Sequence, residues 1–315
     1  MKIGRILLFL ITLTLFGCVK EKVYDVKVIR ATDSRYPSLN NEEFSLVLEK
    51  TKEIMREHFN IKIVYSYIGE EGMSDFFDKY SVRVPNPEKR FWEKRRCNIF
   101  SPDIKRFRAD IFNYLKKYEL DRLKEFLSEE EKGIKTYEEA TERVMEIYER
   151  KLNLINKELD PSRPEIYSYT QWLLLVRYRG DFNLIFINTP FIDDLLFDPA
   201  IHTLVRGGIT CGFIDPVNSG PKNEWGGVFT TFPCLSEIEF LKLERDTDYP
   251  EAQKERLKII SYQMCHELAH LLFEYDDAYD HPNCILNPPK GLRYKIWYDG
   301  IIKAGKCPKK HKKFE

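Results

Sequence analysis

Residues 266–270 read His-Glu-Leu-Ala-His and place two imidazoles and a carboxylate at a spacing that could bind a metal ion. On a helix, positions i and i+4 stand one turn apart on one face, so His266 and His270 could direct ring nitrogens at the same ion. Neutral imidazole is a good Zn²⁺ ligand, and zinc acidifies a bound water. Glu267 could accept the proton of that water, so the pattern predicts hydrolysis with Glu267 as general base.

A helix must carry these residues, and the surrounding sequence predicts one from about residue 250 to about residue 275. Its apolar residues recur at helical spacing and are Leu257, Ile260, Met264, Leu268, Leu271 and Leu272. Two histidines are too few for zinc, so a third protein ligand is expected. Only Glu274 and Glu315 follow as glutamates, one on the same helix and one at the last position. The remaining candidates are Asp276, Asp277, Asp280 and His281.

The motif and the residues after it resemble the metzincin clan of metallopeptidases, whose pattern is HExxHxxGxxH or HExxHxxGxxD followed by a Met-turn. Counting from His266 places the third ligand on Asp276, and Asp277, Asp280 and His281 stay open as alternatives. Residues 283–288 resemble the Met-turn, with Leu286 where methionine usually sits. Phe273 occupies the position of the clan's glycine, where a positive φ would be costly for it. The archaemetzincin-like and snapalysin-like branches are nearest.

This resemblance implies an α/β fold of the metzincin-like zincin type, with a twisted, mixed five-stranded sheet and a Met-turn-like loop. It also implies a zinc-dependent endopeptidase whose antiparallel edge strand, here residues 207–213, binds a protein or peptide substrate. Gly208, Ile209 and Thr210 would contact the substrate backbone, and Tyr294 or Tyr298 could donate to the oxyanion. The alternative is a catalytically inactive binding lipoprotein on the same fold, and a different zinc hydrolase is a weaker option.

The rest of the chain predicts one metallopeptidase domain over residues 23–305, followed by a tail over 306–315. Predicted strands cover residues 23–29, 61–67, 182–188, 207–213 and 227–232, and predicted helices cover 40–59 and 292–304. A large helical insertion is expected over about residues 72–178. Its capping-box pattern at Thr136 and Glu139 predicts the start of one helix.

The N-terminus resembles a bacterial lipoprotein signal. Lys2 and Arg5 precede a short apolar run over residues 6–16, and Gly17 precedes Cys18. We therefore expect a signal peptide over residues 1–17, a lipid on Cys18 and a tether over 18–22. The protein would be exported and anchored to a bacterial membrane through that lipid, facing the periplasm or the cell surface.

Composition narrows the partners. The chain has 50 basic and 50 acidic residues among 315, and without a basic excess we expect no nucleic-acid partner. We also expect a monomer. Six cysteines remain besides Cys18, and none of them forms a CxxC pair. The missing CxxC argues against a cysteine-based zinc site.

Overall fold

The computed structural model describes residues 22–87, 104–127, 134–158, 167–178, 182–192, 212–215, 226–308 and 310–313. Cys18 and the predicted substrate-binding residues Gly208, Ile209 and Thr210 lie outside these ranges. Within them, no helix is both long enough and apolar enough to cross a membrane.

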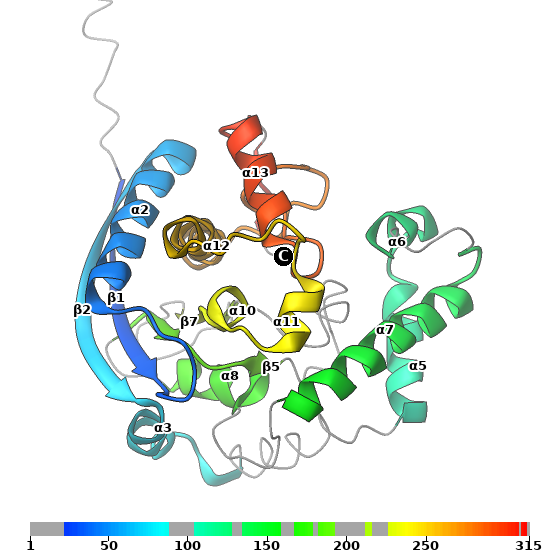
Figure 1. The fold of residues 1–315 in the computed structure, drawn as a ribbon, viewed down its shortest axis with the longest axis horizontal. Helices are drawn as coiled ribbons and strands as arrows, with labels where there is room; N and C mark the ends of the chain where they lie inside the picture. Colours follow the sequence, from blue (N-terminus) through cyan, green and yellow to red (C-terminus); the bar gives the residue numbers. More distant parts are fainter. Residues whose placement is uncertain are drawn as a thin grey trace, which may run out of the picture.

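The described residues contain a mixed five-stranded sheet (Figure 1), as the resemblance to metzincins implies. Its spatial order is β2-β1-β4-β7-β6, formed by Ile61–Gly72, Lys22–Thr32, Leu184–Ile187, Gly226–Thr230 and Gly212–Asp215. The first four strands are parallel, and only the edge strand β6 runs antiparallel to its neighbour β7. The sheet therefore has an antiparallel strand at one edge.

The first crossover matches its prediction closely. Helix α2 (Asn41–Phe59) connects the parallel strands β1 and β2. Asn40 caps it, because the Asn40 Oδ1 accepts from the Glu43 backbone N–H at 2.9 Å and the Glu43 carboxylate accepts from the Asn40 N–H at 2.9 Å. The helix ends at Asn60, whose left-handed conformation turns the chain directly into β2.

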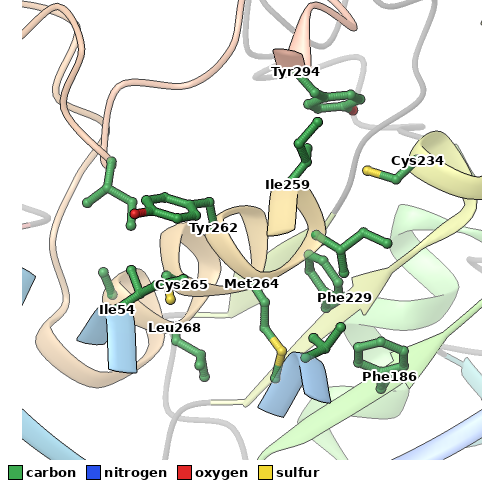
Figure 2. Close-up of a cluster of buried hydrophobic side chains, with 14 of the residues drawn as sticks. Ile54, Phe186, Phe229, Cys234, Ile259, Tyr262, Met264, Cys265, Leu268 and Tyr294 are labelled. Atoms are coloured by element: carbon green, nitrogen blue, oxygen red, sulfur yellow. The ribbon is translucent and has the colours of Figure 1, made fainter. Parts of the chain in front are cut away.

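Alternating side chains give the sheet two buried faces. Leu184 and Phe186 of β4 join the larger core, while Ile185 and Ile187 of the same strand face the other side. Helices α2 and α12 (Gln253–Phe273) cover the first face, and α3 (Met73–Ser81) and α8 (Tyr169–Arg177) cover the second (Figure 1). Figure 2 shows Met264 of α12 extending towards Phe186 in the larger core.

The predicted helical insertion divides into two parts. Helices α5 (Ile104–Leu115), α6 (Leu120–Leu127) and α7 (Tyr137–Glu158) pack around a core of their own. Helices α3 and α8, expected in the same insertion, instead pack under the sheet. The predicted capping box is present at α7, because the Glu139 N–H donates to Thr136 Oγ1 at 3.2 Å. A short pair, β3 (Tyr167–Ser168) and β5 (Phe191–Ile192), is an addition that the sequence did not indicate.

The last part of the chain surrounds α12. Two short helices, α10 (Phe232–Leu235) and α11 (Glu239–Glu244), lead from β7 to α12, and α13 (Tyr294–Ala304) follows it. Nearly every residue of α12 from Leu257 to Leu271 is buried, so this helix is enclosed on all sides. Three of these buried residues are His266, Glu267 and His270, and ionisable groups inside a core call for a partner.

Candidate metal centre

The Nε2 atoms of the two histidines of α12 point towards the same position. Each ring is held from behind by a backbone carbonyl, His266 Nδ1 to Ile285 O at 2.8 Å and His270 Nδ1 to Tyr275 O at 2.5 Å. A carbonyl only accepts, so each Nδ1 carries the hydrogen, and a neutral ring then has its lone pair on Nε2. The two Nε2 atoms are 3.1 Å apart. Both imidazoles are therefore in the tautomer that binds a metal through Nε2.

Asp277 completes the group. Its Oδ1 lies 3.5 Å from His266 Nε2 and 3.4 Å from His270 Nε2. Zinc ligands at bonds of about 2.0–2.1 Å in a tetrahedron are about 3.3–3.4 Å from one another. The three atoms have nearly this spacing, and two lone pairs and a carboxylate facing each other repel unless a proton or a metal ion lies between them. His266, His270 and Asp277 therefore form a candidate metal site that fits a tetrahedral ion with one further position.

The sequence count favoured Asp276, but the structure brings Asp277 to the histidines. Helix α12 ends at Phe273, and the left-handed residue that turns the chain is Glu274, with φ of 59°. In the metzincin pattern the turning glycine precedes the third ligand by three residues. The same interval from Glu274 arrives at Asp277, so a helix exit one residue later moves the ligand position by one residue.

The other candidates lie elsewhere. Asp276 accepts the Asp277 N–H on its Oδ1 at 2.8 Å, and its own N–H donates to Lys312 O, so it supports the loop beside the site. Asp280 is 72% exposed and contacts His281. His281 belongs to a second group of side chains with Cys284, Cys307 and His311.

The pKa of His270 indicates that the side chains around this imidazole favour a positive charge. Burial lowers the pKa of His270, but the Asp277 carboxylate, with smaller contributions from Glu267 and the Tyr275 carbonyl, raises it to about 9. Without a metal, this imidazole would therefore hold a proton at neutral pH. A metal ion would replace that proton and satisfy the same anionic surroundings. Glu267 is 7% exposed and close enough to influence the charge of His270.

The loop predicted to resemble a Met-turn lies against the site. Ile285 supplies the carbonyl that orients His266, and Leu286 is fully buried in the core beneath. The loop is closed by the Ala278 N–H, which donates to Leu286 O at 2.9 Å. Trp297 of α13 packs edge-on towards the His266 ring. The loop thus positions one imidazole of the candidate site.

Tyr279 is a site residue that sequence reasoning missed. Its hydroxyl donates to Asp277 Oδ2 at 2.9 Å, which leaves Oδ1 facing the histidines. Burial, the Asp277 carboxylate and the nearby Tyr114 and Tyr118 of the helical insertion raise the pKa of Tyr279, so the hydroxyl stays protonated. No pattern in the sequence marks this role. Of the two tyrosines considered either as oxyanion donors or as core residues, Tyr294 is buried in the core, and Tyr298 packs on Tyr262.

Comparison with protein-family models, with curated proteins and with solved structures finds no match for this chain. The functional assignment therefore rests on the geometry of these residues.

Proposed function

We propose that this chain is a zinc-dependent endopeptidase of metzincin-like architecture, anchored at the cell envelope by a lipid on Cys18. The observation that supports it best is the convergence of His266 Nε2, His270 Nε2 and Asp277 Oδ1 beside a buried glutamate. Two imidazoles and one carboxylate are a ligand set typical of catalytic zinc, which keeps one coordination position open.

When bound there, zinc would supply Lewis-acid chemistry, polarising a carbonyl and acidifying a water molecule. Other residues of the chain orient the proposed ligands. Ile285 O and Tyr275 O hold the imidazoles in the metal-binding tautomer, and Tyr279 orients the Asp277 carboxylate. These backbone and hydroxyl contacts fix the ligands before substrate arrives.

Glu267 is the general base in this proposal. It directly follows His266, it is buried, and its charge acts on His270. A carboxylate in this place can accept the proton of the attacking water and then pass it to the leaving amine, so that one residue serves both halves of peptide hydrolysis. A purely structural metal site would not need such a base.

The position of strand β6 is consistent with a peptide as the substrate. Strand β6 is antiparallel to β7, forms the edge of the sheet and lies next to α12. An extended peptide could add to this edge as a further strand, with its scissile bond brought over the α12 histidines. Residues 208–210, predicted to contact the peptide, directly precede this strand in the sequence.

The experiment compares the full-length chain, purified in mild detergent, with Glu267→Gln. Removing the base should reduce cleavage of casein by about 10²–10⁴-fold while zinc content stays unchanged. Lys258→Gln, an exposed change two turns earlier on α12, is the matched control and should cleave normally. Zinc binding with no Glu267-dependent cleavage of casein or of a peptide library would favour the catalytically inactive binding lipoprotein instead.

A further inference from the structure

A second group of metal-binding side chains lies beyond the candidate active site. Ligand atoms of His281, Cys284, Cys307 and His311 all lie within 4.8 Å of one another. His281 and Cys284 come from the turns after Asp277, and Cys307 and His311 come from the tail after α13. The first two side chains are buried and the other two are half-buried. Two distant parts of the chain therefore meet at this point and bring together two cysteines and two histidines, although the sequence contains no CxxC pair.

The spacing of the four side chains suits a tetrahedral ion. Cys307 Sγ is 3.7 Å from His281 Nδ1, and Cys284 Sγ is 4.0 Å from His311 Nε2. Bonds of about 2.3 Å to sulfur and about 2.1 Å to nitrogen place neighbouring ligands about 3.6 Å apart in a tetrahedron. These two pairs are therefore within a few tenths of an ångström of that spacing, and all four ligand atoms lie within 4.8 Å of one another. Cys284 and Cys307 are free thiols, so no disulfide occupies this place.

One nitrogen of the half-buried His311 ring has no hydrogen-bond partner. Its Nδ1 atom is buried and unpaired, and its Nε2 makes a long contact of 4.0 Å to Cys284 Sγ. Unpaired polar atoms of this kind are rare in native interiors and call for a bound water or ion. The ring sits between Tyr275 and His281, with centroid distances of 5.3 and 5.6 Å.

The backbone presents these side chains from tight turns. The Cys284 N–H donates to His281 O at 3.1 Å, and the Leu286 N–H points at Cys284 Sγ at 3.4 Å. Burial raises the pKa of the Cys284 thiol, and the Leu286 N–H directed at its sulfur opposes that rise. The tail is held by the Asp276 N–H donating to Lys312 O and by a bridge between Tyr275 and Lys313.

We propose that His281, Cys284, Cys307 and His311 bind a second zinc ion, in a closed structural site distinct from the candidate active site. Four protein ligands fill a tetrahedral shell and leave no position for substrate or water, so this ion would have no catalytic part. On binding, the two thiols release their protons to solvent. The ion would join the tail to the turn that precedes Ile285, the residue that orients His266. This inference does not depend on the first site being catalytic.

The test measures metal content of the full-length chain by mass spectrometry after dialysis against trace zinc. We expect two zinc ions per chain, and one in the double variant Cys284→Ser/Cys307→Ser. The variant His266→Ala/His270→Ala should also retain one zinc, now at the second site. Cys265→Ser is the matched control and should retain two, because Cys265 is buried against Thr51 O and lies outside both groups.

A second measurement covers the case in which the cysteine variants fold poorly. The unchanged chain is loaded with Co²⁺, and its absorption spectrum is recorded. Thiolate-to-cobalt charge transfer in the near ultraviolet, retained in His266→Ala/His270→Ala, supports the second site. A single zinc per chain without such a transition would overturn the proposal, and so would a Cys284–Cys307 disulfide in the natively purified protein.

Discussion

The two candidate metal sites, which both include residues of the loop after α12, are built in different ways. In the first, His266 and His270 lie one turn apart on a single helix, and only Asp277 comes from a loop. In the second, one turn supplies His281 and Cys284, and a tail that returns from α13 supplies the others. The first group depends on one helix and its exit. The second depends on two segments meeting, so only the first has a pattern that the sequence displays as one motif.

The largest expected effect is on zinc affinity, and it distinguishes the proposed ligand Asp277 from its neighbour Asp276. Asp277→Asn should weaken zinc binding at the first site by more than about 100-fold, because it removes a charged ligand and not only a supporting contact. Asp276→Asn should bind zinc nearly as the unchanged chain does, since an asparagine oxygen can still accept the Asp277 N–H. Competition with a fluorescent chelator measures both affinities. Equal losses in the two variants would contradict the assignment of Asp277.

Most of this first group could be predicted from the sequence, and the remainder shows what limits such prediction. The spacing of His266 and His270 is fixed by helix geometry, so both were found directly. The choice between Asp276 and Asp277 depends on whether α12 ends at Phe273 or one residue earlier, a difference that helix patterns do not resolve.

The second group was missed for a different reason. Its sequence carries His-x2-Cys at 281–284 and Cys-x3-His at 307–311, mixed pairs that a search for CxxC overlooks. In the folded chain, the pairing of residues 312–313 with 275–276 helps to bring these halves together. Most strands were predictable from their apolar and β-branched residues, but their order in the sheet, β2-β1-β4-β7-β6, was not, because it depends on contacts between distant segments. The separate core of α5–α7 was not predicted either, because its helices resemble surface helices of the main domain.

The next prediction concerns pH in the zinc-free chain. The pKa of His270 is raised from 6.5 to about 9, so its protonation stabilises the fold fully below pH 6.5 and is lost as the pH rises through 9. Stability should fall by up to about 3 kcal/mol over this window. Urea unfolding of chelator-treated protein measures it.

The zinc-loaded chain should behave in the opposite way over the same pH window, because protons compete with the metal for His270. Its stability should rise with pH and then level off. A zinc-free stability that stays constant from pH 6.5 to 9 would argue against close contact between His270 and Asp277.

Tyr279→Phe should have a smaller effect on the same site. Losing the hydroxyl frees the Asp277 carboxylate to rotate, and such supporting contacts contribute about 10–100-fold in metal affinity. We expect a loss near the lower end, about 10-fold, because the ligand itself remains. The chelator competition used for Asp277 measures it, and Tyr298→Phe, which changes a hydroxyl on α13, is the control. Unchanged zinc affinity in Tyr279→Phe would mean that the Tyr279 hydroxyl does not help to position Asp277.

The smallest expected effect is at the exit of α12. Glu274 has a φ of 59°, a conformation that costs any residue with a Cβ. Glu274→Gly should therefore be about 1 kcal/mol more stable than Glu274→Ala, since both lose the ion pair with Lys313 and only alanine retains the strain. Thermal unfolding of the two variants compares them directly. A more stable alanine variant would mean that α12 does not end as described.

The central claim is that His266, His270 and Asp277 bind one metal ion together. Crystals of the zinc-loaded chain, measured at the zinc absorption edge, test it most directly through the anomalous difference map. We expect an anomalous peak about 2.0–2.2 Å from His266 Nε2, from His270 Nε2 and from an Asp277 oxygen. A map without a peak between these atoms, or with Asp276 as the third ligand, would contradict it.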